Sequence, residues 1–221
     1  MNIIKKAIDI DSLLLPLAYT IVFLVSLTFH EIAHGYTALK LGDATAKRQG
    51  RLSLNPFKHI DMFGLILLIA ARVGYAKPVM INPHNLENPK RDMAVISLAG
   101  PITNLFLAAV FSIPFYMLKH NYFLGIPVFL GLLIEVGYFL NITFAVFNIL
   151  PIPPLDGSKV IGCLLPDTVY NKIVMFNPMK GMGLIIILSV TGILAIIMNP
   201  MMNSVHNFYT IIAKFFIDWF G

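Results

Sequence analysis

Long apolar runs separated by shorter polar stretches set the pattern of this chain. Three of the runs cover residues 13–41, 93–118 and 124–150. Each is longer than the roughly 20 residues that a helix needs to cross about 30 Å of hydrocarbon. The pattern therefore predicts three membrane-spanning helices.

The C-terminal third is predicted to add one or two further helices. An apolar run over residues 183–198 ends at Asn199-Pro200 and is expected to form a fourth span. Residues 205–220 are rich in aromatic side chains, which suits either a short last span or a helix on the membrane surface. Residues 151–180 begin with closely spaced prolines, which exclude a regular helix there, and we expect a loop.

The polar stretch between the first and second spans is expected to contain small non-helical elements. The alternation from Arg51 to Leu54 predicts a short β-strand, on which an extended substrate could pair by strand addition. Residues 62–71 are apolar but too short to span, which favours a re-entrant or interfacial segment. Residues 1–12 are polar and are predicted to form a lead-in at the membrane surface.

These elements predict an all-α polytopic membrane protein with a small β or re-entrant element after the first helix. We expect one membrane-embedded domain over residues 1–221. It would consist of a three-helix core at about residues 13–160 and C-terminal helices at about residues 183–220.

Composition supports an integral membrane protein and excludes a soluble peptidase. Hydrophobic residues make up 57% of the chain, charged residues only 12%, and the mean hydropathy is +0.80. The net charge of +5 is expected to reflect topology and contact with anionic lipid, with no role in binding nucleic acid. Because Cys163 is the single cysteine, an internal disulfide and a multi-cysteine zinc site are excluded.

The distribution of positive charge predicts the orientation. Residues 43–92 contain eight Lys or Arg and residues 151–182 contain three, whereas the turn at Lys119 contains one. The positive-inside rule then places both larger loops in the cytoplasm, across a plasma or inner membrane. Lys5 and Lys6, which would lie outside, run against this assignment.

The sequence His30-Glu31-Ile32-Ala33-His34 lies in the C-terminal half of the first predicted span. On a helix, His30 and His34 share a face and can bind one Zn²⁺, with Glu31 as base for a metal-bound water. Ionisable groups in a membrane helix cost roughly 2.5–3.5 kcal/mol each, so this cluster requires a compensating partner, and a metal supplies one. The alternative is a polar patch that faces a water-filled cavity or pairs with other helices.

A catalytic zinc site needs a third protein ligand, and Asp156 is the best candidate. It follows a proline-rich break at the predicted depth of the histidines, although it would also suit the N-cap of a following helix. His59, Asp61 and Glu135 compete with it. His59 and Asp61 sit in a polar loop that favours a surface role, and Glu135 suits a polar contact between helices or a lateral gate.

The predicted chemistry is attack of a metal-bound water on a carbonyl group, most simply that of a peptide bond, which is thereby hydrolysed. Zinc lowers the pKa of bound water to about 7, and Glu31 can accept its proton. The developing oxyanion needs further donors, for which Asn148 is the first candidate and Asn104 the second. A hydrogen bond between helices is the alternative role of Asn148.

Taken together, these motifs resemble the site-2 protease family of intramembrane zinc metalloproteases, in its compact prokaryotic branch without PDZ or CBS domains. The resemblance rests on residues 30–35 and 148–157, and is strengthened by Gly100-Pro101 with Asn104 and by Asn55-Pro56 with His59 and Asp61. It implies that one Zn²⁺ is held by His30, His34 and Asp156. It also implies Glu31 as the base, Asn148 as a substrate- or oxyanion-binding residue, and cleavage of transmembrane substrates near the cytoplasmic face.

Two other functions compete with an intramembrane zinc endopeptidase. In a transporter or channel the polar residues would line an ion path, but no inverted repeat is visible. In an inactive relative the chain would bind and sequester membrane proteins. The expected partners of the protease are single-span membrane-protein substrates and the lipid bilayer, and the sequence leaves a homo-oligomer open.

Overall fold

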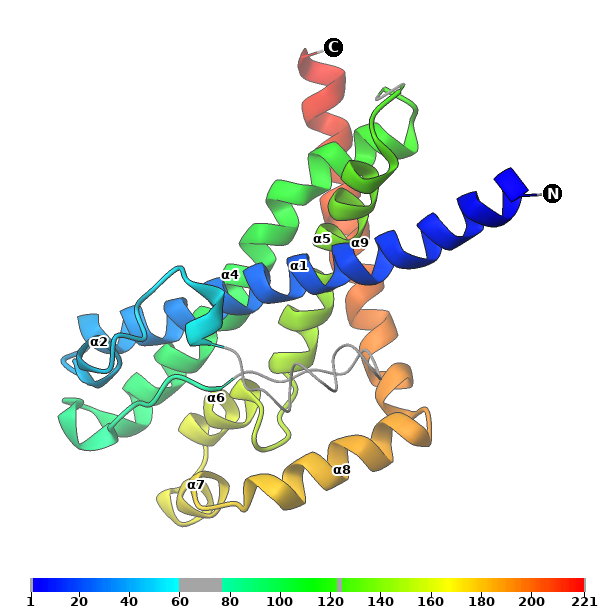
Figure 1. Ribbon diagram of the computed structural model, residues 1–221. Coiled ribbons are helices and arrows are strands. Elements are labelled where there is room, and N and C mark those ends of the chain that lie inside the picture. Colours follow the sequence, from blue (N-terminus) through cyan, green and yellow to red (C-terminus); the bar gives the residue numbers. More distant parts are fainter. Residues whose placement is uncertain (1, 60–76, 123–124, 221) are drawn as a thin grey trace.

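The computed structural model describes residues 2–59, 77–122 and 125–220, and within these ranges all regular structure is helical. Four long helices form the body, and shorter helices gather at one end of it (Figure 1). The long helices are α1 (Asn2–Lys40), α4 (Pro89–Lys119), α5 (Val128–Asn148) and α9 (Ile193–Phe220). The short ones are α2 (Thr45–Arg48), α6 (Asp156–Leu164), α7 (Asp167–Val174), α8 (Pro178–Val190) and the 3₁₀ turns η1 (Pro56–Lys58) and η2 (Pro83–Asn85).

The three predicted spans and the all-α polytopic fold are confirmed. Helical segments Leu13–Lys40, Pro89–Lys119 and Val128–Asn148 are long and apolar enough to cross a membrane. Among the residues that the structure describes, a fourth span arises if α7 and α8, which meet at a bend of 84°, count as one. Helix α4 packs against both α1 and α5, and α1 crosses them obliquely (Figure 1).

Two segments predicted outside the spans contain helix. Helix α1 begins at Asn2, so residues 2–12 of the expected surface lead-in are helical and continue into the first span, which starts at Leu13. The predicted loop at residues 151–180 contains α6, α7 and the start of α8. Prolines did not prevent this because Pro166 and Pro178 lie at helix starts, where the missing N–H has no intrahelical partner to lose.

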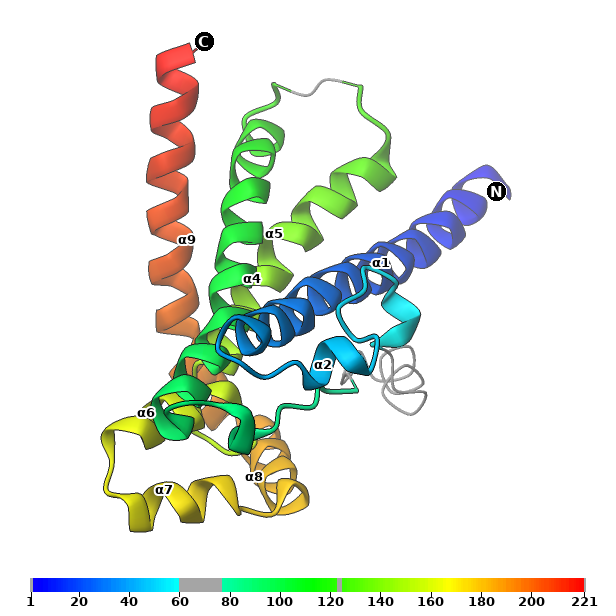
Figure 2. The same ribbon diagram turned by 90° about the vertical axis from the view of Figure 1, so that its left-hand side faces the viewer.

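The predicted fourth span over residues 183–198 is wrong. Gly192 has a φ of +76°, in the left-handed region that suits glycine, and it separates α8 from α9. Helix α9 then continues through Pro200, so residues 205–220 form the second half of one 28-residue helix. This helix lies beside α4 (Figure 2), and its Met198 and Tyr209 enter the main core.

The predicted strand near Arg51 is also wrong. The guanidinium of Arg51 donates hydrogen bonds to the carbonyls of Lys58, Lys77 and Pro78, so the chain wraps around this side chain and forms no ladder here. Asn55 accepts a hydrogen bond from the Phe57 N–H and caps η1. Substrate pairing on this stretch therefore loses its basis, and the re-entrant segment predicted at residues 62–71 lies outside the described residues.

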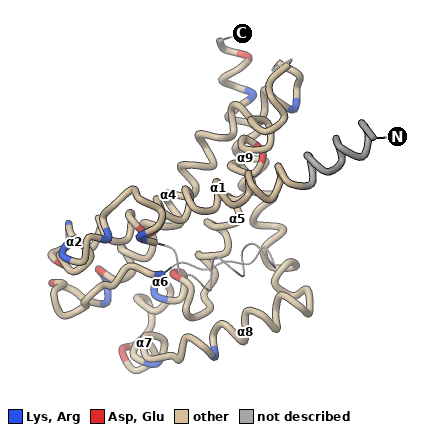
Figure 3. Tube along the Cα trace, in the orientation of Figure 1, with Lys and Arg blue, Asp and Glu red and all other residues tan. Residues whose placement is uncertain are grey.

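The two larger loops lie at the same end of the helices. Lys90, at the start of α4, donates to the Leu165 carbonyl at 2.5 Å and pairs with Asp167 of α7 at 2.9 Å. Figure 3 shows charged residues gathered around α2, α6 and α7, whereas the middle of the long helices is nearly free of them. The prediction that both loops share one side of the membrane therefore agrees with direct contacts.

Candidate metal centre

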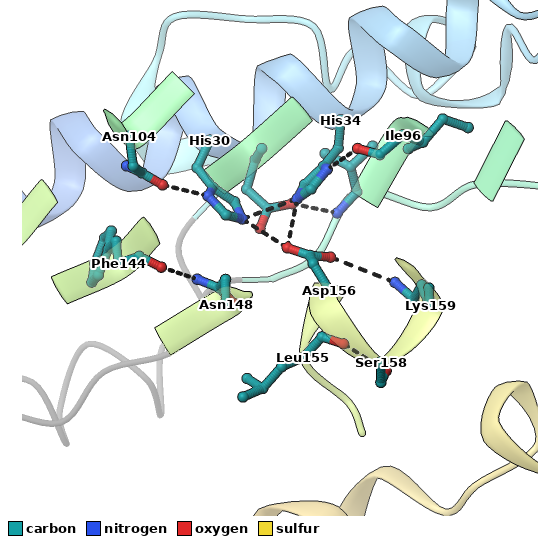
Figure 4. A network of polar contacts seen from close by, with 12 residues as sticks. His30, His34, Ile96, Asn104, Phe144, Asn148, Leu155, Asp156, Ser158 and Lys159 are labelled. Carbon is teal, nitrogen blue, oxygen red and sulfur yellow. Dashed lines mark hydrogen bonds and ion pairs between the residues drawn. The ribbon is translucent and has the colours of Figure 1, made fainter. Parts of the chain in front are cut away.

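Three side chains from two distant parts of the chain converge in the interior. The Nε2 atoms of His30 and His34 lie 3.3 and 3.1 Å from Oδ2 of Asp156, and 2.9 Å from each other. All three residues are buried, and one ligand atom from each lies within 4.8 Å of the others. Figure 4 shows the two imidazoles reaching from α1 toward the carboxylate, which comes from α6.

The chain after α5 turns back sharply to deliver Asp156. Gly157 permits this turn, since a Cβ there would collide with the Ile149 and Leu150 carbonyls. Asp156 is the first residue of α6, and Leu155 occupies the N-cap position without a side-chain capping bond. The alternative of Asp156 as a capping residue is therefore wrong, and its carboxylate faces the histidines.

A glycine also lets α4 approach the histidines closely. A Cβ at Gly100 would lie 2.5 Å from Cε1 of His30 and 2.6 Å from the Nε2 atoms of both histidines. Because such distances are shorter than any normal contact, only glycine leaves room for both rings. The space between α1 and α4 is thus shaped around the two imidazoles.

Hydrogen bonds on the far side of each ring determine which nitrogen carries the proton. Nδ1 of His34 lies 2.7 Å from the Ile96 carbonyl, and Nδ1 of His30 lies 2.6 Å from Oδ1 of Asn104. Carbonyl oxygens only accept, so each Nδ1 must donate and each neutral ring presents a lone pair at Nε2. This is the orientation that metal-binding histidines adopt.

The centre therefore brings together two lone pairs and a carboxylate oxygen, with no hydrogen-bond donor between them when both imidazoles are neutral. Such a group of acceptors repels itself unless a cation, either a proton or a metal ion, lies among them. Two imidazoles and one carboxylate are a donor set that suits catalytic Zn²⁺ and leaves a position for water. The residues present thus fit one zinc ion.

The carboxylate of Asp156 is held in its ionised form. Burial, the largest influence, acts to raise its pKa, but the charge of a proton held at His34, hydrogen bonds from the protonated histidine nitrogens and the nearby Lys159 together lower the pKa below the ordinary value. The Lys159 ammonium lies 3.7 Å from Oδ1, on the side away from the histidines. An anionic Asp156 can therefore offer Oδ2 to a cation.

Glu31 is buried beside this centre, on the helix that carries both histidines. Its Oε2 accepts a hydrogen bond of 2.8 Å from the backbone N–H of Val79. This bond fixes the position of the Glu31 carboxylate.

The two predicted donors to substrate lie close by but make other contacts. Asn104 has no exposed surface and uses Oδ1 for His30 and Nδ2 for Asn141, at 2.9 Å. In this structure its side chain contacts His30 and Asn141, and its contact with substrate stays a prediction. Asn148 ends α5 and donates to the Phe144 carbonyl at 3.1 Å, within its own helix (Figure 4).

The two competing ligands that the structure describes, Glu135 and His59, do not join the centre. Glu135 pairs with Lys119 of α4 at 3.4 Å, which agrees with a polar contact between helices. His59, expected at the surface, is buried, and its Nε2 lies 2.8 Å from the Ser53 carbonyl. Asp61 lies outside the described residues.

Sequence reasoning missed two residues that support the histidines, Ile96 directly and Asn141 through Asn104. The Ile96 carbonyl is a backbone group, so no sequence signal marks it. Asn141 had a signal, because it is a polar residue in the middle of an apolar span, but its connection to His30 depends on the rotation of α4 and α5. Only the packed structure reveals that rotation.

Comparisons with known proteins agree with this chemistry. The family model described as peptidase family M50 matches residues 18–130. The chain is 38% identical over 192 residues to "Putative zinc metalloprotease YwhC" of Bacillus subtilis, covering 83% of this chain and 85% of that protein.

Relatives from other organisms carry similar names. The chain is 32% identical over 217 residues to "Putative zinc metalloprotease Rip2" of Mycolicibacterium smegmatis, covering 91% of this chain and 76% of that protein. It is 29% identical over 175 residues to "Putative zinc metalloprotease MJ0611" of Methanocaldococcus jannaschii, covering 71% and 83%. No solved structure matches the chain.

Proposed function

We propose how this chain works from the family to which it belongs, peptidase family M50 or the site-2 protease family, whose members are zinc metalloendopeptidases of the membrane. In this proposal His30, His34 and Asp156 hold the zinc ion, and Glu31 is the base. The substrate is a membrane protein with a single span, cleaved within or near that span. The protein works as one domain, and its active site opens toward the cytoplasmic side of the plasma membrane.

One observation carries the ligand assignment. Two buried imidazole nitrogens that carry lone pairs lie 2.9 Å apart, with a buried carboxylate oxygen within 3.3 Å of both. A polar patch that lined an ion path would pair donors with acceptors. Here acceptors face acceptors, an arrangement that a bound cation stabilises.

The residues around the centre divide the reaction among them. Bound zinc supplies Lewis acidity and lowers the pKa of a bound water to about 7. Glu31, held by the Val79 N–H, takes up the proton and then delivers it to the departing amine. Asn148 carries a second amide N–H besides the one that Phe144 accepts, and this group donates to the substrate oxygen.

The depth of the site favours substrates that lie in the membrane. His30, Glu31 and His34 are buried in the second half of the span Leu13–Lys40. A peptide bond reaches that depth when part of a substrate span unwinds and enters between the helices. The core supports a single domain, since Leu155 beside the ligand packs with Ile185 of α8 and Met198 of α9.

The test compares the wild type with Glu31→Gln in bilayer discs, using a panel of single-span substrates. Zinc content and cleavage positions are measured on the same samples. We expect zinc in both proteins, with cleavage inside a substrate span at least about 100-fold slower in the variant. Equal cleavage by both would overturn the role of Glu31, and no zinc in either would overturn the metal centre. Zinc in both without cleavage of any substrate would favour the sequestering function.

The proposed orientation has its own test. Cys163 lies in α6, the helix that begins with Asp156, and is the single thiol of the chain. A membrane-impermeant maleimide should label it in inverted vesicles and leave it unlabelled in right-side-out cells, with Cys163→Ser as the control. The opposite labelling would place the site on the outer face.

A further inference from the structure

We propose that Asn141 is a positioning residue for the metal centre, and that it acts through Asn104 to set the tautomer of His30. The proposal rests on the proposed function, because it assumes that Nε2 of His30 binds zinc. It assigns a task to a polar side chain in the middle of α5 that touches neither zinc ligand nor substrate.

A chain of hydrogen bonds connects three helices. The Gly137 carbonyl accepts from Nδ2 of Asn141 at 2.7 Å, and Oδ1 of Asn141 accepts from Nδ2 of Asn104 at 2.9 Å. Oδ1 of Asn104 then lies 2.6 Å from Nδ1 of His30. The chain thus runs from the α5 backbone through α4 to α1.

The direction of these bonds follows from the Gly137 end. A backbone carbonyl can only accept, so Asn141 must turn its NH₂ group toward Gly137 and its oxygen toward Asn104. Asn104 must in turn offer its NH₂ group to Asn141 and its oxygen to His30. Nδ1 of His30 is then the protonated nitrogen, and Nε2 keeps its lone pair for the metal.

Because both asparagines are buried, the direction of these hydrogen bonds cannot reverse without a cost in free energy. Asn104 and Asn141 both have 0% exposed surface, so water does not replace a lost partner. An amide flipped at either position would place oxygen against oxygen, or NH₂ against N–H, in a low-dielectric interior. Each such mismatch leaves a buried polar group unsatisfied, at about 1–3 kcal/mol.

His34 shows why His30 needs this arrangement. The partner of His34 is the Ile96 carbonyl, a backbone acceptor that cannot flip. The partner of His30 is an amide, which can present either end. Asn141 removes that freedom, so both rings are held in the same tautomer.

The decisive variants separate this role from a bond that merely ties α4 to α5. Asn141→Leu removes the acceptor for Asn104, whose amide can then flip and turn a donor toward His30. We expect zinc to bind about 10- to 100-fold more weakly, the usual effect of losing an outer partner of a ligand. Asn104→Asp offers only acceptors to His30, so in the double variant Asn104→Asp with Asn141→Leu we expect zinc affinity to return to within about threefold of Asn104→Asp alone.

Controls distinguish failure of this proposal from failure of the metal centre. Thr143→Val alters a half-buried side chain of α5 whose hydroxyl donates to the Phe139 carbonyl of its own helix, and zinc affinity should stay at the wild-type value. His30→Ala should lose zinc. If it retains zinc, the ligand assignment is wrong; if it loses zinc while Asn141→Leu binds normally, only the present proposal is overturned.

Two further readouts keep the proposal testable if Asn141→Leu folds poorly. Nitrogen-15 NMR of histidine-labelled, zinc-free wild type, with His30 assigned by difference from His30→Ala, should show the proton on Nδ1. A His30 ring without a proton on Nδ1 would overturn the proposal, whether or not Nε2 carries one. So would a double variant that binds zinc about 10-fold or more weakly than Asn104→Asp alone, because the carboxylate would then not have removed the need for Asn141.

Discussion

Asp43 and Asp156 are both buried carboxylates at the ends of helices, yet their surroundings are opposite in kind. Asp43 has no exposed surface and receives four hydrogen bonds, all from donors: the Thr45 N–H, the Thr45 hydroxyl, the Asn85 amide and the Asn82 N–H. Asp156 instead faces two histidine nitrogens that carry lone pairs when the rings are neutral.

The kind of group around a buried carboxylate, donor or acceptor, distinguishes a structural acid from a functional one. The donors around Asp43 neutralise its charge, and they fasten the end of α1 to the segment before α4, so nothing further is needed. The histidine nitrogens that face Oδ2 of Asp156 are acceptors when the rings are neutral, so the fold itself supplies neither a donor nor a cation to this oxygen. A buried carboxylate that faces acceptors is therefore a marker of a cation site, whereas one surrounded by donors is not.

The largest expected effect comes from removing the charge of Asp156. Asp156→Asn keeps the size of the side chain, but the neutral amide is a poor zinc ligand. We expect zinc affinity to fall by more than the about 100-fold loss typical of an outer partner, and proteolysis to disappear. Isothermal titration with zinc and a cleavage assay check this.

The zinc-free Asp156→Asn protein gives the complementary result. Its free energy of unfolding should stay within about 1 kcal/mol of the zinc-free wild type, because the new amide N–H can donate to a histidine Nε2. Normal zinc binding by this variant would show that the third ligand lies elsewhere in the chain.

Removing Asp43 should have the opposite profile. Asp43→Ala leaves the N–H groups of Thr45 and Asn82 and the amide of Asn85 without their acceptor. We expect the free energy of unfolding to fall by about 3 kcal/mol, while zinc affinity stays within about threefold of the wild type. Denaturant titration in detergent and zinc titration of the same sample measure the two quantities. A loss of zinc with unchanged stability would reverse the roles assigned to the two carboxylates.

The sequence predicted the surroundings of Asp156 much better than those of Asp43. His30 and His34 could be placed on one face because helical spacing is regular, and Asp156 because few carboxylates were available at that depth. Their convergence agrees with the prediction. The spans were also predictable, since each is a long apolar run.

What the sequence could not supply depends on packing between distant segments. The residues from Arg51 to Leu54 alternate in sequence as a strand would. The sequence does not reveal that they wrap around Arg51, because the carbonyls that its guanidinium binds lie up to 27 residues away. The break at Gly192 falls inside an apolar run and is set by one backbone angle. The contact of Asn104 with His30 depends on which face of α4 meets α1, so the sequence did not reveal it.

A smaller effect is expected at Gly100, where α4 approaches both histidines. Gly100→Ala would push the imidazoles away from Asp156, since a Cβ there meets both rings. Overpacking of this kind costs about 1–3 kcal/mol. We expect zinc affinity to fall about tenfold, with Gly183→Ala as the control, because a Cβ at Gly183 meets no atom within 4 Å among the described residues. Equal effects of the two substitutions would mean that the rings tolerate displacement.

The smallest expected effect is a pH dependence specific to Asp43. Burial, the largest influence, acts to raise its pKa, but hydrogen bonds from Thr45, Asn85 and Asn82 lower the pKa below its ordinary value. A carboxyl whose pKa is lower in the folded state contributes its full stability above the unfolded pKa of about 3.9, and this contribution declines as pH falls toward the folded value.

Asp43→Asn provides the comparison, because it keeps the shape of the side chain and cannot ionise. The wild type should be more stable by about 1 kcal/mol, constant from about pH 5 to 8, and the difference should shrink as pH falls below about 4. Denaturant titrations of both proteins at each pH measure it, and subtraction cancels other groups such as Asp156, which titrate in both. A difference that grew as pH fell would mean that the donors around Asp43 do not stabilise its anion, and the contrast with Asp156 would then lose its physical basis.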